Sequence, residues 1–166
     1  MNKLLPVAAA LVSLCAAPAI AACSGPGTPM FHCTFKGGTK EVRVCLQGEV
    51  VLYSYGDRGR TPELVMGRRE IGVNMTPWSG VGRSIWEEIT FYNGTYSYIL
   101  SYAIDRQIEG APVEGRLIVA DGDSEVAELV CDTGSVTAHD FYPLFEAKEA
   151  AGQRYCRDTF SWGSGC

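Results

Sequence analysis

The chain has 166 residues, of which 46% are hydrophobic and 20% are charged, so its length and apolar fraction predict one folded domain and exclude a disordered chain. The formal net charge is −5 and the 14 basic residues do not cluster, which argues against nucleic acid as a partner. No internal apolar run approaches the roughly 20 residues of a membrane-spanning helix, so we expect no transmembrane segment.

Residues 1–21 are predicted to be a signal peptide rather than part of the fold. A positively charged start precedes an apolar run rich in Ala, Leu and Val, and Ala19-Ile20-Ala21 fits the small-x-small pattern of a cleavage site. Residues 22–166 then form a single secreted domain. Because the leader has the Ala-rich style of bacterial signal peptides, we expect the protein to be periplasmic or secreted.

Cys23 allows a second interpretation of the N-terminal region. The segment Ile20-Ala21-Ala22-Cys23 resembles a lipoprotein processing box, which would anchor the protein through a lipid on Cys23. Without the signal peptide the chain keeps six cysteines, an even number that allows three disulfides in an oxidising compartment. Lipidation would leave five cysteines and one unpaired thiol, so parity favours the soluble secreted form.

Strand patterns dominate the first half of the domain. Five strands are expected before the middle of the chain, over residues 31–35, 41–46, 50–55, 63–66 and 70–75. The first three are separated by glycine-containing turns at Gly37-Gly38 and Gln47-Gly48, and apolar and polar side chains alternate in the second. Consecutive strands with short turns predict an antiparallel meander.

The clearest hairpin joins residues 86–92 to residues 95–102 through Asn93-Gly94, the strongest short hairpin signal. A two-residue loop at Asn93-Gly94 would place Phe91 opposite Tyr96 and would separate apolar from polar side chains on two faces. The face expected in the core carries Ile85, Ile89, Phe91, Tyr96, Tyr98, Leu100 and Tyr102. The face expected in solvent carries Trp86, Glu88, Thr90, Thr95, Ser97 and Ser101.

The last third of the chain predicts one more hairpin and one helix. The hairpin spans residues 115–131 and turns at residues 121–124. The helix is expected to have Asp140 as its cap, Pro143 in its first turn, good helix formers over residues 144–151 and Gly152 at its end. The expected fold is therefore all-β, an antiparallel meander barrel or sandwich of about eight strands with a short C-terminal helix and a disulfide-pinned tail.

The six cysteines of the secreted domain are expected to form structural disulfides. None of them lies in a C-x-x-C motif and no His lies at zinc spacing, so we predict no metal and no other cofactor. Six cysteines allow fifteen pairings. The sequence favours only Cys156–Cys166, because this bridge would close a short glycine-rich tail and pin the chain terminus. The six residues are Cys23, Cys33, Cys45, Cys131, Cys156 and Cys166.

Catalysis is not favoured, and we assign no catalytic residue. His32 and His139 are the two histidines, and no G-x-S-x-G motif is present. Glu87 lies on the apolar face of its strand, which more often marks a β-bulge or a barrel rim than a buried carboxyl with a raised pKa. A small hydrolase using Glu87 or His139 is therefore the least favoured hypothesis, after an envelope structural protein with no defined ligand.

The favoured hypothesis is a non-catalytic periplasmic binding or inhibitory module that acts through the loop at residues 76–86. Exposed Trp and Arg are enriched at binding hot spots, and glycines let a loop project from the fold. The residues expected to bind a protein partner are Trp78, Ser79, Gly80, Arg83 and Trp86. The alternative is that Trp78 packs back over one end of the barrel.

The layout of residues 30–131 resembles the secreted or lipid-anchored bacterial inhibitors of c-type lysozyme, which are small antiparallel β-barrels. In that family a Ser-Gly-x-x-Tyr loop enters the lysozyme cleft, and Ser79-Gly80-Val81-Gly82 begins similarly, with Arg83 in the place of the Tyr. The family's later Lys has no counterpart here. The resemblance implies a barrel-closing Cys33–Cys131 disulfide and a basic protein partner such as lysozyme, to which an acidic chain is complementary.

Overall fold

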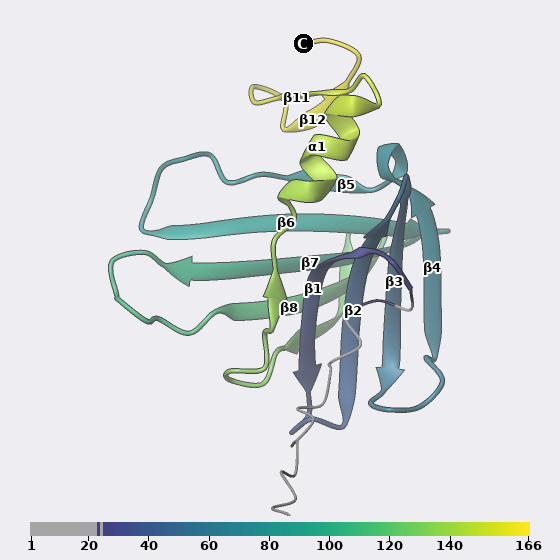
Figure 1. Cartoon of the computed structure of the whole chain (residues 1–166), viewed down its shortest axis with the longest axis vertical. Helices are drawn as coiled ribbons and strands as arrows, with labels where there is room; N and C mark the ends of the chain where they lie inside the picture. Colours follow the sequence, from purple (N-terminus) through teal and green to yellow (C-terminus); the bar gives the residue numbers. More distant parts are fainter. Residues whose placement is uncertain (1–22, 24) are drawn as a thin grey trace, which may run out of the picture.

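The computed structural model describes Cys23 and residues 25–166, so the predicted signal peptide lies outside the described residues. Within them, ten strands form two five-stranded antiparallel sheets (Figure 1). The first sheet has the order β10-β1-β2-β3-β4 and contains β1 (Thr28–Phe35), β2 (Lys40–Gln47), β3 (Val50–Asp57), β4 (Leu64–Arg69) and β10 (Ala138–His139). The second follows chain order and contains β5 (Asn74–Thr76), β6 (Ser84–Asn93), β7 (Tyr96–Asp105), β8 (Glu114–Asp121) and β9 (Ser124–Val130).

The predicted all-β class is confirmed. The expected number of about eight strands corresponds to β1–β4 and β6–β9, each of which has six residues or more. One expected strand, over residues 70–75, is wrong in part. The chain crosses here from the first sheet to the second, so Glu70–Gly72 form a 3-10 turn (η1) and β5 starts only at Asn74.

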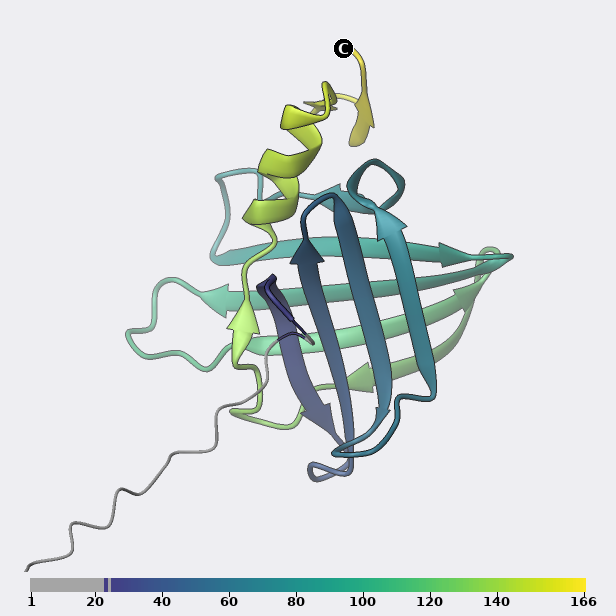
Figure 2. The ribbon, with the colours of Figure 1, turned by 45° about the vertical axis from the view of Figure 1, so that its right-hand side comes forward.

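The two sheets pack face to face, and their strands cross at a steep angle (Figures 1 and 2). Apolar side chains from both sheets fill the space between them, which is the packing typical of a β-sandwich. Tyr53 of the first sheet lies 5.4 Å from Phe91 of the second, measured between ring centroids, and both rings are buried. The core thus joins the sheets through aromatic contacts.

Three of the tight hairpin turns begin with a glycine: Gly48-Glu49, Gly94-Thr95 and Gly122-Asp123. Each glycine has a positive φ and the residue after it does not, which is the pattern of a type II′ turn. The expected loop at Asn93-Gly94 is therefore one residue too early, and Phe91 pairs with Tyr98 rather than with Tyr96. Since this changes the pairing by two residues, the two faces of the hairpin stay as predicted.

The separation of faces on β6 and β7 is confirmed at most positions. Ile89, Phe91 and Leu100 are fully buried, whereas Trp86 on the other face is 38% exposed. Two positions are exceptions. Tyr96, which directly follows the turn, was expected in the core and is 41% exposed, and Thr90 was expected in solvent and is buried. Its backbone pairs with β5 on one side and with β7 on the other, so neighbouring strands flank it on both sides.

All six cysteines of the described residues are paired. The expected Cys156–Cys166 bridge is present, and Cys33–Cys131 is the pair that the resemblance implies. The third bridge, Cys23–Cys45, attaches the start of the described chain to β2. Cys33–Cys131 links β1 of the first sheet to the residue that follows β9 of the second, so it holds the two sheets together.

The Cys23–Cys45 bridge uses the sulfur atom that lipidation would require, which gives a first prediction. Protein purified from its native compartment and denatured without reduction should react with no thiol reagent, because all six sulfur atoms are bonded. Mass spectrometry of the labelled protein measures this directly. One labelled cysteine, at Cys45, would instead indicate that Cys23 carries a lipid.

Helix α1 (Tyr142–Ala150) closes one end of the sandwich. The helix lies where it was expected, with Pro143 in its first turn. Asp140 directly precedes the N-cap residue Phe141, and its Oδ1 accepts a hydrogen bond of 3.0 Å from the Tyr142 N–H. The buried Lys148 fixes the helix to η1, since its Nζ donates to the carbonyls of Glu70 and Val73 at 2.9 and 2.6 Å. No helix in the described part of the chain has the length and apolar character needed to cross a membrane.

The C-terminal tail is a small hairpin of β11 (Arg154–Cys156) and β12 (Ser161–Gly163), which the sequence did not indicate. Trp162 of β12 is the residue that attaches it to the rest of the molecule. Its ring lies 5.0 Å from that of Phe145 on α1, and its Nε1–H donates a 2.7 Å hydrogen bond to the Met75 carbonyl. The tail therefore packs on α1 and on β5.

Candidate binding cleft

The loop between β5 and β6 extends beyond the sandwich beside the loop between β7 and β8 (Figures 1 and 2). The backbone N–H of Arg106 donates to the Arg83 carbonyl, and the Arg83 guanidinium forms an ion pair of 2.6 Å with Asp105. This pairing lowers the pKa of Asp105 below its ordinary value, because the bond from Arg83 favours the carboxylate. The two loops thus support each other, and Arg83 is engaged within the protein.

Trp78 is half-buried, so part of its side chain packs back on the protein as the alternative interpretation expected. Its Nε1–H donates a 3.0 Å hydrogen bond to the Val81 carbonyl, which closes the loop on itself. The Arg106 guanidinium lies 5.3 Å from the centre of the Trp78 ring, in a cation–π arrangement. The ring is thereby fixed in place while part of it remains accessible.

Two adjoining hollows lie between this loop, β6, α1 and the tail hairpin, and together we name them the aromatic cleft. The larger has a volume of about 710 Å³ and is lined by Pro77, Trp78, Ile85, Glu87, Tyr142, Phe145, Glu149, Arg154, Tyr155, Arg157 and Cys166. The smaller has a volume of about 320 Å³ and is lined by Thr76, Pro77, Trp78, Ser79, Trp86, Tyr155, Arg157 and Phe160. Four residues, Pro77, Trp78, Tyr155 and Arg157, line both hollows and form the wall that the two share.

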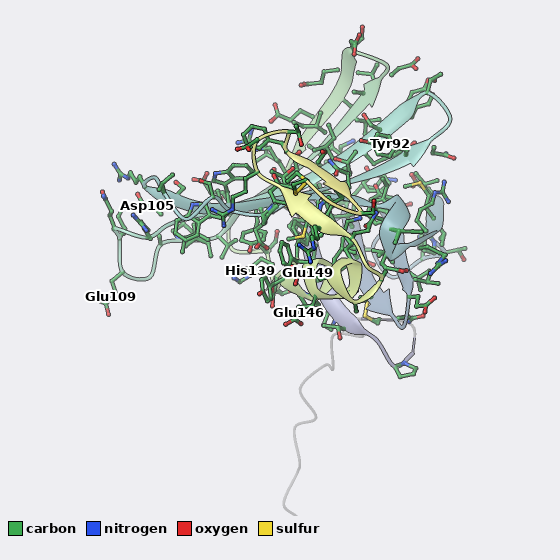
Figure 3. All side chains as sticks on the ribbon, turned by 90° about the horizontal axis from the view of Figure 1, so that it is seen from above. Tyr92, Asp105, Glu109, His139, Glu146 and Glu149 are labelled. Atoms are coloured by element: carbon green, nitrogen blue, oxygen red, sulfur yellow. A yellow bond between two sulfur atoms is a disulfide. The ribbon has the colours of Figure 1, made fainter. Side chains whose placement is uncertain are left out.

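The structure brings together three of the five residues expected to bind a partner. Trp78, Ser79 and Trp86 line the smaller hollow. Gly80 and Arg83 are exposed on the protruding loop and line neither hollow. Asp105, the partner of Arg83, lies well to one side of α1, as Figure 3 shows by the positions of Asp105 and Glu149.

Glu87 lies where β6 meets the larger hollow, and it is 8% exposed. Its Oε2 accepts hydrogen bonds from the Tyr102 hydroxyl at 2.7 Å and from the Phe141 N–H at 3.0 Å. The pairing of β6 with β7 runs without a shift from Ser84 to Asn93. The expected bulge is therefore absent, and Glu87 is the buried, hydrogen-bonded carboxyl that was the less favoured interpretation.

Burial raises the pKa of Glu87 above its ordinary value of 4.5, although the bonds from Tyr102 and Phe141 favour the carboxylate. A carboxyl whose pKa is higher in the folded chain stabilises the fold most below its unfolded pKa, and this contribution is lost as the pH rises through the folded pKa. We therefore expect Glu87→Gln, which keeps an acceptor but cannot ionise, to gain stability relative to wild type as the pH rises above 4.5.

Denaturant unfolding of the two proteins at several pH values measures this difference, since the other titrating groups are common to both. Glu87→Leu serves as the matched control, because it leaves the Tyr102 hydroxyl and the Phe141 N–H without an acceptor. We expect it to be about 1–3 kcal/mol less stable than Glu87→Gln at every pH, since neither variant can ionise at this position. A constant difference between wild type and Glu87→Gln would show that the pKa of Glu87 is not raised.

The two histidines do not line the aromatic cleft. His32 is buried, its Nδ1 lies 2.6 Å from the Thr137 hydroxyl, and burial lowers its pKa. His139 lies in β10, where its ring packs against the edge of Tyr102 with 5.5 Å between centroids. Both histidines therefore serve the packing of the sandwich, and His139 does not share the hollow that Glu87 lines.

The sequence did not indicate the part of the cleft that comes from α1 and the tail. Tyr142 and Phe145 stack with 5.4 Å between ring centroids, and Trp162 continues this row of rings to Tyr155, again at 5.4 Å. Five aromatic residues within the last 25 positions would have been a signal. Only tertiary packing, however, places Tyr142, Phe145 and Tyr155 at the hollow that Trp78 lines.

No family model, no curated protein and no solved structure matches this chain. The similarity to inhibitors of c-type lysozyme accordingly stays a prediction from a short motif.

Proposed function

We propose that this protein is a non-catalytic binding module that acts outside the cytoplasm and takes its ligand into the aromatic cleft. The observation that carries the proposal is the cleft itself, a depression walled by aromatic rings from three separate parts of the chain. Ligand sites are concave, mostly apolar and supplied with a few polar groups, and their volumes are about 300–1,000 Å³. The larger hollow, at about 710 Å³, lies within that range.

The walls of the cleft are held rigidly, which favours binding because less conformational entropy is lost when a ligand enters. The Cys156–Cys166 bridge ties the tail hairpin to the chain terminus. The Trp162 hydrogen bond to Met75 and the packing of Lys148, 5.0 Å above the Trp162 ring, attach that hairpin to the sandwich. Burial lowers the pKa of Lys148 to about 8, as expected for an ammonium group enclosed by this packing.

The lining of the cleft favours binding over catalysis. Nucleophilic catalysis needs a nucleophile and a base in contact, and among the described lining residues there is no His and the one Cys is in a disulfide. Glu87 uses one carboxylate oxygen to hold Tyr102 and Phe141. The second carboxylate of the cleft, Glu149, is exposed on the surface of α1.

Location outside the cytoplasm is supported by three disulfides, which persist in oxidising compartments. Pairing of Cys23 with Cys45 supports the unlipidated periplasmic or secreted form. The inhibitory form of the function, against a basic protein such as c-type lysozyme, is supported by the net charge of −5 and by the Ser79-Gly80 loop.

The test compares the wild type with Trp86→Ala and with the control Tyr92→Ala. Both side chains are exposed aromatics of β6, but Tyr92 lies away from α1 and the tail (Figure 3). Each protein is immobilised and exposed to a cell-envelope extract and, separately, to purified c-type lysozyme. We expect wild type and Tyr92→Ala to retain the same component and Trp86→Ala to lose most of it.

Equal retention by Trp86→Ala would place the binding site elsewhere and contradict the proposal. If none of the three proteins retains any component, the result would contradict a binding function altogether. The experiment with lysozyme tests the inhibitory function separately. Inhibition of lysozyme by the wild type that Trp86→Ala abolishes would support this function, whereas lysozyme activity that the wild type leaves unchanged would contradict it.

A further inference from the structure

We propose that the ligand of the aromatic cleft is a chain of uncharged pyranose sugars at least two rings long. This inference rests on the proposed binding function and names its ligand class. The larger hollow offers flat aromatic walls from Trp78, Tyr142, Phe145 and Tyr155. Such walls suit a ligand with flat apolar faces, and the C–H faces of a pyranose ring meet the negative face of an aromatic ring favourably.

The charged residues of the larger hollow point to a neutral ligand with many hydroxyl groups. Two acidic residues, Glu87 and Glu149, and two basic residues, Arg154 and Arg157, line it, so their formal charges cancel. The two carboxylates would repel a polyanionic ligand, and the two guanidinium groups would repel a polycationic ligand. A hydroxyl both donates and accepts, so it can use the carboxylate oxygens and the guanidinium N–H groups alike.

The same four side chains argue against a purely apolar ligand such as an acyl chain. An apolar occupant would remove water from charged groups without replacing their hydrogen bonds, which is unfavourable. Glu87 is the most enclosed of the four. Its Oε2 is held by Tyr102 and Phe141, and its Oε1 has no hydrogen-bond partner among the described residues, so this oxygen is left for a ligand hydroxyl.

The length of the ligand follows from the adjoining hollows. Trp78 and Tyr155 belong to the wall that the two hollows share, so a ligand that is long enough to cross this wall can contact aromatic rings on either side of it. The smaller hollow has little polar lining besides Arg157, Thr76 and Ser79. A sugar chain that starts in the larger hollow can therefore continue across Tyr155 into the smaller one.

The backbone conformation and exposure of Phe160 independently support a ligand contact at the smaller hollow. Phe160 has φ of 50°, which a non-glycine residue rarely adopts, and its side chain is 67% exposed. An exposed aromatic ring held by an unfavourable backbone conformation does not serve core packing, and such strain is concentrated at functional sites. Phe160 lies in the turn between β11 and β12 and lines the smaller hollow, where it provides a stacking surface at the cleft.

The experiment titrates the intact secreted protein with defined oligosaccharides and follows binding by calorimetry and by tryptophan fluorescence. The probes are two- to six-ring oligomers of glucose, galactose and N-acetylglucosamine, together with a sulfated oligosaccharide as the charged comparison. We expect at least one neutral series to bind, more tightly as it lengthens from two rings upward. Phe160→Ala and Glu87→Gln should each weaken it by about tenfold.

Two controls keep the result interpretable. Tyr92→Ala should bind as the wild type does, because Tyr92 lines neither hollow. Phe160→Ala should remain folded, with an unchanged melting temperature, because the side chain is exposed.

Each failure has a distinct meaning. If no oligosaccharide binds but an envelope protein or lysozyme is retained in a manner that depends on Trp86, the sugar inference is overturned and the binding function stands. Tighter binding of the sulfated probe, or binding that neither Phe160→Ala nor Glu87→Gln weakens, also overturns the inference. Release of new reducing ends from a bound probe would support the ligand class and overturn the non-catalytic part of the function.

Discussion

Replacing both cysteines of the Cys33–Cys131 bridge with Ala is expected to lower the free energy of unfolding by about 4–5 kcal/mol. The two residues are separated by 98 positions, and a disulfide stabilises mainly by restricting the unfolded chain, more so when the closed loop is long. Both side chains are buried in the core, so the loss of packing adds to the loss of the cross-link. Denaturant unfolding under non-reducing conditions measures the change.

The Cys156–Cys166 bridge gives the matched comparison, because it closes a loop with a sequence separation of only 10. The same model gives about 3 kcal/mol for such a short loop, and the tail lies outside the packed sandwich. This variant should therefore lose less stability but should lose ligand binding, since Tyr155 and Arg157 depend on the tail hairpin. A loss at Cys33–Cys131 no larger than at Cys156–Cys166 would contradict this account.

The sequence predicted the faces of the sheets better than the register of their strands. Alternation of apolar and polar side chains along residues 86–102 identified the core face, because the period of two depends only on the pleat. The pairing depends on which residues occupy the turn. Asn93-Gly94 favoured a turn with two residues at positive φ, whereas Gly94 alone adopts positive φ and the loop includes Thr95 instead.

The sequence predicted only that part of the candidate site whose residues lie close together in the chain. Trp78, Ser79 and Trp86 lie within nine residues of one another, and the structure places all three on the smaller hollow. The opposite wall comes from Tyr155 and Phe160, about 80 residues later, and no local pattern tells where a tail will pack. Glu87 was recognised as unusual from its position on an apolar face, but its partners Tyr102 and Phe141 follow from register and tertiary packing.

Phe91→Ala is expected to lower the free energy of unfolding by about 3–5 kcal/mol, as is typical of a buried aromatic residue. Phe91 is fully buried, and its ring contacts Tyr53 across the two sheets, with 5.4 Å between centroids. Removing the ring leaves a cavity in the centre of the sandwich, which the rigid strands on either side cannot fill. Such an aromatic pair also contributes about 0.5–1.5 kcal/mol beyond the area that it buries.

The neighbouring Tyr92→Ala should change the free energy of unfolding by no more than about 0.5 kcal/mol, because its side chain is 53% exposed on the other face of β6. The bonds from Arg68 to the Tyr92 carbonyl involve only backbone at Tyr92 and survive the substitution. The double variant Phe91→Ala/Tyr53→Ala should lose less than the sum of the single losses, because the two rings contact each other. Equal losses for Phe91→Ala and Tyr92→Ala would mean that the faces of β6 are assigned wrongly, and strict additivity with Tyr53 would mean that the sheets do not meet at these rings.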